Sequence, residues 1–408
     1  MRLSSFSLGA FFIASVGCGG TSGNAGNGGD GGENAGAGGQ AAQGGGGQGQ
    51  GGQIGQGGST PAGIPIFVAQ GHAGRTTISC DDGKTWVANR SDDEVIRCFS
   101  SPETDCDHHP GAGRGITYGN GYFVSTFGWG KPGSIRRSKN GFDWETTLPD
   151  RTFAGVVFGN GIFLAGERPA YTSVDSGATF MAGGDPVGDV WNVRRTGFAP
   201  HDGGRFLLAF ESGATAVNIS KDQGATWALP SSIPSTCAAD MQWSGGFAYN
   251  GSAIVLAGGT GVACRSLDGG DTWTAAPMGG TVSATALMFT GGQFVTFGQA
   301  DDGKGGTFPA KFTSADGETW MKTPTQVRVK QADGTVVTSA GPNLGAVARG
   351  DSGTYVGVRG GWQVWYEDQV FYRSQDGVLW DALEAGKFAP SHPIQFITSG
   401  IGEATACQ

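Results

Sequence analysis

Charged residues are scarce in this chain of 408 residues. Only 15% of them are Asp, Glu, Lys or Arg, and 26 basic against 35 acidic side chains leave a net charge of −9. Proteins that bind nucleic acid neutralise phosphates with a stripe or patch of Lys and Arg, and no basic stripe occurs in this sequence. We therefore expect no nucleic acid among its partners.

Long apolar runs and helical periodicity are also missing. No segment of useful length has a helical period. The apolar run over residues 8–17 is too short to span a bilayer, and it lies between Arg2 and Cys18, as in a secretion signal. Residues 1–18 resemble a bacterial lipoprotein signal, which implies cleavage before Cys18 and lipidation of that residue. An ordinary signal peptide that happens to contain a Cys is the alternative.

Residues 19–60 are dominated by glycine, with 21 Gly between positions 19 and 58. Such a composition cannot bury enough apolar area to offset chain entropy, so we expect a disordered linker. A flexible coil of this length spans ~35 Å. Together with the signal, it predicts an exported, membrane-tethered protein of the cell envelope, held at the outer membrane and facing the periplasm or the cell exterior, with a folded domain over residues 61–408.

A short motif recurs seven times in that domain. Its full form is Ser-x-Asp-x-Gly-x-Thr-Trp and its shorter form Ser-x-Asp-Gly-x-x-Trp, and successive copies start 35 to 60 residues apart. A period of this size is typical of propellers and arrays. Asp accepts hydrogen bonds from the backbone of a tight turn, Gly supplies positive φ, and Trp opens the next strand with a large apolar face. The acceptor positions are Asp81, Asn140, Asp175, Asp222, Asp268, Asp316 and Asp376.

These copies resemble the Asp-box, or BNR repeat, of sialidase-like β-propellers. The resemblance covers about residues 64–408 and implies an all-β fold in which the Asp residues form turns rather than a catalytic or metal site. Each unit reads as four short strands, which is one propeller blade. The first unit lacks its inner strand, and residues 393–400 form an inner strand without a blade. We therefore predict a seven-bladed β-propeller closed by a C-terminal strand that completes the first blade.

Six cysteines remain once Cys18 is lipidated, and an exported chain favours disulfides. The blade topology predicts a bridge across the ring closure, one within the loop between the first two blades, and one between the entry loop and the third strand of blade five. Free thiols are the alternative. The predicted pairs are Cys80–Cys407, Cys98–Cys106 and Cys237–Cys264.

The Asp-box turns share one face of a propeller, which we call the bottom face, and the connections between blades lie on the opposite, top face. Five residues that suit a divalent metal or acid–base chemistry fall on the top face near blades one and two. No HExxH or other fixed metal spacing is present, so loop packing is the alternative, and no cofactor is firmly implied. The candidates are His72, Asp107, His108, His109 and His392.

Aromatic and polar residues also collect on the predicted top-face loops. Flat rings beside charged groups suit stacking and hydrogen bonding to a sugar, although packing of loop against loop is the alternative. The predicted ligand-binding residues are Trp129, Glu167, Arg168, Trp191, Trp362, Trp365 and Tyr366.

Resemblance to sialidases raises hydrolysis as a function, but the Arg-Ile-Pro motif of that family is absent and no carboxylate pair can be identified from spacing. The leading hypothesis is a monomeric binding or scaffold module that holds a glycan or protein ligand on its top face. A glycoside hydrolase or lyase acting on a polysaccharide is one alternative, and a purely structural envelope lipoprotein is another.

Overall fold

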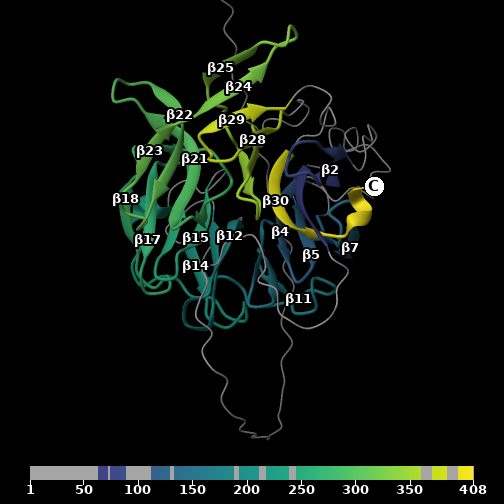
Figure 1. Ribbon diagram of the computed structural model, residues 1–408. Helices are drawn as coiled ribbons and strands as arrows, with labels where there is room; N and C mark the ends of the chain where they lie inside the picture. The colour runs from purple at the N-terminus through teal and green to yellow at the C-terminus, as the bar shows by residue number, and fades with distance from the viewer. Residues whose placement is uncertain are drawn as a thin grey trace, which may run out of the picture. The chain divides into compact units, whose positions relative to one another are not determined.

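The computed structural model describes residues 63–71, 74–88, 112–128, 133–187, 193–210, 217–238, 245–359, 370–383 and 394–407 (Figure 1). The predicted signal over residues 1–18, its Cys18 and the linker over residues 19–60 lie outside these ranges. None of the helices in the described ranges is long and apolar enough to cross a membrane. The described strands form seven sheets, and the all-β seven-bladed propeller is confirmed.

Blade one is built from both ends of the propeller chain. From the channel outward it contains β30 (Ile394–Gly402), β1 (Ile64–Gly71), β2 (Thr76–Ser79) and β3 (Val87–Ala88). β1 and β30 run antiparallel and stay in register from the pair Ile64 and Gly402 to the pair Gln70 and Phe396. The predicted closure of the ring by a C-terminal strand is therefore confirmed.

Blades two, three and five follow the expected four-strand pattern. Blade two contains β4 (Ala112–Gly119), β5 (Tyr122–Gly128), β6 (Ile135–Ser138) and β7 (Glu145–Leu148). Blade three contains β8 (Val156–Gly159), β9 (Ile162–Ala165), β10 (Tyr171–Ser173) and β11 (Met181–Ala182). Blade five contains β15 (Gly246–Tyr249), β16 (Ile254–Ala257), β17 (Val262–Ser266) and β18 (Thr274–Pro277).

Blade four departs from the prediction that each Trp opens a fourth strand. Its sheet contains three strands, β12 (Val193–Ala199), β13 (Arg205–Phe210) and β14 (Val217–Ser220). After Trp227 the described chain pairs with β14 through a single bridge between Ile219 and Ala228. Pro230 follows two residues later, and a proline cannot donate to a ladder, so the fourth strand ends before it is established.

Blades six and seven are larger than expected. Blade six contains β19 (Gly280–Val282) and β20 (Met288–Thr290), both paired with β21 (Gln293–Asp301), then β22 (Thr307–Ser314) and β23 (Met321–Pro324). Blade seven contains β26 (Ala346–Arg349), β27 (Tyr355–Val358), β28 (Tyr372–Ser374) and β29 (Leu379–Ala382). A hairpin of β24 (Gln326–Lys330) and β25 (Val336–Ala340) extends blade seven through parallel pairing of β24 with β29.

Neighbouring blades pack through aromatic rings placed over glycines. The ring of Phe198 in blade four lies over Gly159 in blade three, where an added Cβ would come within 2.1 Å of a ring carbon. Phe158 has the same relation to Gly119 in blade two, at 2.2 Å. Any side chain at these glycines would displace the next blade's ring, so close packing between blades depends on glycine at the end of the inner strand.

Two disulfides lie within the described residues. Cys80 in the first Asp-box is bonded to Cys407 in the short helix η3 (Ala404–Cys407), across 327 residues of sequence. Cys237 in the short helix α2 (Ser235–Ala238) is bonded to Cys264 in β17. Both predicted bridges are thus present and indicate an extracytoplasmic protein. The predicted Cys98–Cys106 pair lies outside the described residues.

Candidate functional site

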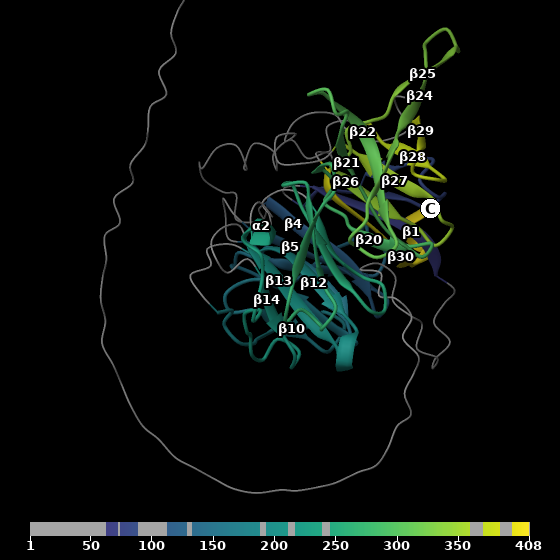
Figure 2. The ribbon, with the colours of Figure 1, turned by 90° about the vertical axis from the view of Figure 1, so that its left-hand side faces the viewer.

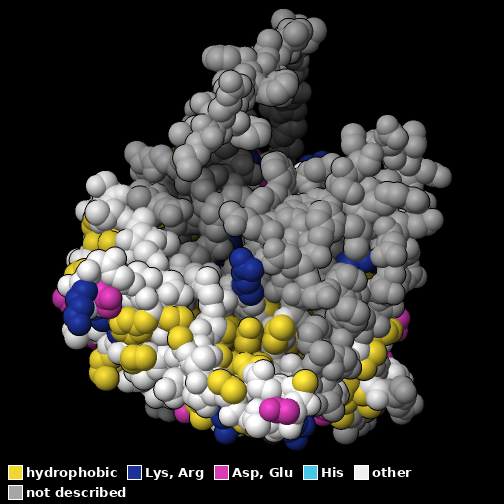
Figure 3. All heavy atoms as spheres, turned by 90° about the horizontal axis from the view of Figure 1, so that it is seen from above, with side chains coloured by type: hydrophobic (Ala, Val, Ile, Leu, Met, Phe, Trp, Pro, Cys, Tyr) yellow, Lys and Arg dark blue, Asp and Glu magenta, His cyan; other side chains and the backbone are white. Residues whose placement is uncertain are grey.

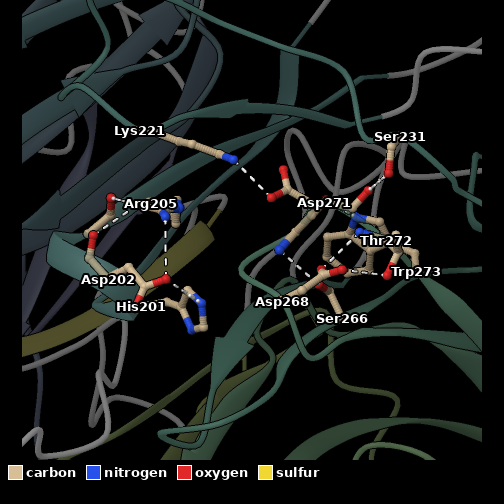
Figure 4. A network of polar contacts seen from close by, with 12 residues as sticks. His201, Asp202, Arg205, Lys221, Ser231, Ser266, Asp268, Asp271, Thr272 and Trp273 are labelled. Carbon is tan, nitrogen blue, oxygen red and sulfur yellow. Dashed lines mark hydrogen bonds and ion pairs between the residues drawn. The ribbon is translucent and has the colours of Figure 1, made fainter.

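The Asp-box of blade five shows how the repeated motif is used (Figure 4). Ser266 Oγ donates to Asp268 Oδ1 at 2.8 Å and accepts from the Gly270 N–H at 2.7 Å. The Thr272 N–H donates to Asp268 Oδ1 at 2.9 Å, and Trp273 Nε1 donates to the Gly270 carbonyl at 2.7 Å. Each polar group of the motif has a partner inside the turn, so the motif stabilises a strand connection.

The same Ser-to-acceptor hydrogen bond occurs in every copy. The seven bonds join Ser79 to Asp81, Ser138 to Asn140, Ser173 to Asp175, Ser220 to Asp222, Ser266 to Asp268, Ser314 to Asp316, and Ser374 to Asp376. Since the acceptor oxygens are occupied by hydrogen bonds of the turn, these positions offer no catalytic carboxylate.

The turns also lower carboxyl pKa values. Hydrogen bonds from the side chain and backbone of Thr179 and from Ser173 lower the pKa of Asp175 to about 2. Burial acts in the opposite direction at Asp268, yet hydrogen bonds from Thr272 and Ser266 still lower the pKa of that carboxyl. The ionised form is therefore favoured by the folded state.

Acid is accordingly expected to destabilise the propeller through these turns. A carboxyl whose folded pKa lies below its unfolded pKa stabilises the fold above the unfolded value, and the contribution is lost as pH falls through the folded value. We expect the thermal midpoint to fall between about pH 4 and about pH 2. Asp175→Asn should lower the midpoint at pH 7 and converge with wild type near pH 2, as followed by circular dichroism. The control is Asp301→Asn, because Asp301 lies outside the Asp-box turns. If the thermal midpoint of Asp175→Asn changed with pH in the same way as that of Asp301→Asn, the expectation would be contradicted.

The central channel is the cavity that all seven blades share. Its lining comes from β4, β8, β12, β15, β26 and β30 and from residues 285–287 before β20, and the cavity measures about 130 Å³. Inner strands of a propeller run in the same direction, so residues near their starts lie together at the top face. Thr285 donates its N–H to the Gly345 carbonyl at 2.7 Å and links blade six to blade seven at this level.

Two half-buried arginines line the upper part of the channel. Arg114 lies near the start of β4 and Arg195 near the start of β12, in blades that flank blade three. Arg195 Nε donates to the Gly245 carbonyl at 3.0 Å, which fixes its guanidinium across the entrance to blade five. Neither arginine was predicted as a site residue. The sequence does contain a signal for both arginines, because a charged residue at the start of an inner strand is unusual. The starts of these two strands contain Gly-Arg-Gly and Arg-Arg-Thr-Gly.

Glu167 lies in the loop between β9 and β10 and interacts electrostatically with Arg114. Burial raises the pKa of the Glu167 carboxyl to about 6, while the Arg168 backbone N–H and the positive charge of Arg114 act in the opposite direction. A half-buried carboxyl with this pKa exchanges protons near neutral pH and suits proton transfer as well as hydrogen bonding. Of the predicted ligand-binding residues, Glu167 is half-buried and interacts with Arg114 of the channel lining, whereas Arg168 is exposed to solvent.

The other predicted site residues fall outside the described ranges. For the metal site these are His72, Asp107, His108, His109 and His392, and for the ligand site Trp129, Trp191, Trp362, Trp365 and Tyr366. Among the residues that the structure describes, no group of three or more His, Cys, Asp or Glu side chains could hold a metal ion. On the described surface in Figure 3, Lys, Arg, Asp and Glu side chains lie in small separate groups.

A polar cluster on the bottom face joins blade seven to blade one. Asp82, in the first Asp-box, accepts hydrogen bonds from Ser352 and Thr354, both at 2.6 Å, and forms an ion pair with Arg373. Burial acts against ionisation of Asp82, but these hydrogen bonds and the Arg373 charge lower its pKa overall. The cluster reinforces the interface between blade seven and blade one.

Comparison with solved structures finds propellers of low sequence identity. They include "YCF48 bound to D1 peptide" at 17% identity and a TM-score of 0.42, covering 64% of this chain and 83% of that chain. The GH74 xyloglucanase from Xanthomonas campestris has 14% identity and a TM-score of 0.46, and covers 83% of this chain. This chain spans 52% of that enzyme. No protein-family model and no curated protein sequence matches the chain. The chain resembles YCF48 and GH74 propellers in fold.

Proposed function

We propose that the propeller is the ligand-binding head of an exported protein and that it holds an acidic group of a glycan or protein ligand at the top of its channel. The observation that carries the proposal is the pair of half-buried guanidiniums from Arg114 and Arg195 in the channel lining. A guanidinium presents a planar fork of N–H donors that matches a carboxylate, and partial burial strengthens the attraction.

The channel dimensions favour recognition of a small group rather than of a whole chain. A cavity of about 130 Å³ accommodates a carboxylate and the few atoms beside it, while the rest of a polymer would lie on the top face. Glu167 beside Arg114 would add a hydrogen-bond partner whose protonation varies near pH 6. The protonated carboxyl of Glu167 could donate to an acidic group, whereas its ionised form would repel that group, so the second contact would be present below about pH 6 and lost above it.

Charge removal in the channel should weaken this binding. We expect Arg114→Gln and Arg195→Gln each to weaken binding of oligogalacturonate or of an acidic peptide by at least roughly tenfold, the loss of one charge-assisted hydrogen bond. Isothermal titration calorimetry at two salt concentrations measures the effect. Lys221→Gln removes one positive charge on the bottom face and should bind as wild type. Equal affinity of all three variants, or no binding of either probe, would contradict the proposal.

Hydrolysis of a polysaccharide is the second candidate, and Glu167 is the observation that favours it. A carboxyl of pKa about 6 is suited to act as a general acid on a glycosidic oxygen. The test is release of reducing sugar from a polysaccharide panel by the wild type and by Glu167→Gln. Activity that survives in Glu167→Gln, or no release from any substrate, would remove this candidate.

The membrane attachment is also a proposal. We propose that Cys18 carries the lipid and that the glycine-rich segment separates the head from the membrane. Cys18→Ser should move the protein from the membrane fraction to the soluble fraction of the cell envelope. Retention of Cys18→Ser in the membrane fraction would show that a different contact holds the protein there.

A further inference from the structure

The β24–β25 hairpin is an addition to the propeller that the binding site does not use. In Figures 1 and 2 it projects beyond the other strands of blade seven. Its base is held firmly: Arg328 donates to both carboxylate oxygens of Asp381 at 2.6 and 2.7 Å, and Val327 is buried in the core cluster of blades six and seven. The hairpin is thus a fixed extension of a six-stranded sheet, and β25 is the last strand of that sheet.

The hydrogen bonds of the hairpin determine which backbone groups of β25 face outward. The Gln331 N–H donates to the Thr335 carbonyl at 2.7 Å, and the Gly341 N–H donates to the Thr325 carbonyl at 2.9 Å. Bonded and non-bonded pairs alternate along an antiparallel ladder, so Val337 and Ser339 bond to β24. The N–H and C=O groups of Val336, Thr338 and Ala340 therefore point away from β24. No backbone group elsewhere in the described chain pairs with them.

The open edge of β25 lacks the features that usually block strand addition. Residues 335–340 read Thr-Val-Val-Thr-Ser-Ala and contain no charged residue and no proline. All of β25 is exposed, including Val336 at 60% and Val337 at 48% of their full accessible surface. Exposed edges are normally protected by charge, proline or a covering segment, because an unpaired edge invites another strand.

We propose that β25 pairs with β25 of a second copy of this chain in an antiparallel, two-fold symmetric sheet. A two-fold axis at Thr338 places Thr338 opposite Thr338 and Val336 opposite Ala340 of the second copy. Three outward N–H groups on each strand then meet three outward carbonyls on the other, so every outward backbone group of the described strand is bonded. The sequence favours a monomer, and this hairpin, which the sequence analysis missed, is the reason to infer a dimer.

The side chains in this register are compatible with their own copies. The Thr338 pair and the pairs of Val336 with Ala340 are favourable cross-strand pairs, while Val337 lies opposite Ser339. No like charges oppose one another because residues 335–340 are uncharged. A pairing of two five-residue strands buries far less than the roughly 1,600 Å² of a stable interface. The dimer is therefore weak and is populated at high local concentration.

Sedimentation equilibrium of the full-length chain over a range of concentrations tests the proposal. The expected result is a monomer–dimer equilibrium in the wild type that Val336→Pro weakens by roughly tenfold or more, since proline removes an outward N–H and blocks the edge. The fold should tolerate this change, because the Val336 N–H makes no bond to β24. Val336→Ala keeps the N–H and should dimerise like the wild type within about threefold.

A cross-link locates the contact. With a short bismaleimide, Thr338→Cys should give covalent dimer at least roughly tenfold faster than Lys304→Cys, in an exposed turn of blade six, and faster than the wild type. A monomer at every concentration with no faster cross-linking at position 338 would overturn the proposal and leave the edge to a strand from another protein. A dimer that survives Val336→Pro would overturn it as well, because the contact would then lie elsewhere.

Discussion

Loss of the Cys80–Cys407 bridge is expected to lower the free energy of unfolding by about 6 kcal/mol, the chain-entropy value for a loop of this length. The bridge spans 327 residues and connects the first Asp-box to the end of the chain, so it restricts nearly the whole propeller in the unfolded state. The double variant Cys80→Ser/Cys407→Ser should show this loss in urea unfolding under non-reducing conditions.

Lys84→Ala is a matched control, because Lys84 is exposed in the same turn and its removal leaves the bridge intact. It should change the free energy of unfolding by less than about 0.5 kcal/mol. If the double cysteine variant lost less than about 1 kcal/mol, the pairing of β1 with β30 would be sufficient to close the ring, and the entropic argument would fail for this protein.

Trp380→Ala is expected to cost about 4 kcal/mol of stability, in the range measured for buried aromatic residues. Trp380 belongs to the last Asp-box and is fully buried. Its ring lies 5.5 Å from the ring of Phe297 in blade six, in an edge-on arrangement, and its Nε1 donates to the Gly377 carbonyl at 3.2 Å. The substitution would open a cavity between two blades and leave that carbonyl without its partner.

Trp380→Phe separates the contribution of ring packing from that of the indole hydrogen bond. It retains most of the ring volume and removes the indole N–H, so we expect a loss of about 1–2 kcal/mol. The third Asp-box already carries Phe180 in place of Trp, which shows that the turn itself accepts Phe. Thermal and urea unfolding of both variants measure the difference, and equal losses for Ala and Phe would mean that the hydrogen bond, and not the packing, dominates.

The blade count followed from the sequence because the motif that marks each blade is local. Ser, Asp, Gly and Trp lie within eight residues, and their hydrogen bonds close inside one turn, as at Ser266 and Asp268. Ring closure was predictable for a related reason, since one inner strand was missing at the start and one was surplus at the end. Both inferences depended on counting strands rather than on knowing how the blades contact one another.

The β24–β25 hairpin could not be predicted by such counting. The interval between the last two motifs is 60 residues, close to the 59 of the first interval, so its length alone does not distinguish a loop from a hairpin. The local signal is Asp333-Gly334 after the alternating residues 326–330, which is typical of a hairpin turn but does not indicate where the hairpin attaches. Its attachment depends on tertiary contacts, the pairing of β24 with β29 and the Arg328–Asp381 ion pair. Neither leaves a local pattern, and the partners are 53 residues apart.

The candidate site was predicted only in part, for the same reason. The sequence analysis names Glu167 as a predicted ligand-binding residue, but Arg114 and Arg195 become neighbours of one cavity only when the inner strands meet. The pKa of Glu167 likewise depends on its burial in the folded protein and on the charge of Arg114. The inner strands meet around the central channel and bring together residues that lie far apart in the sequence. A search for local motifs does not detect such a group of residues.

Closure of blade one by both ends of the propeller gives the chain a cyclic order. Ile64 is paired with Gly402, so the first and last strands are adjacent, as if a hairpin turn between them had been cut. A gene in which a short turn joins these strands and new ends are opened at the exposed turn near Lys304 would encode the same strand pairings within the blades, without the Cys80–Cys407 bridge. The position of the two ends of the propeller chain therefore determines from which blade the N-terminal segment extends. It does not determine how the strands pair within the blades.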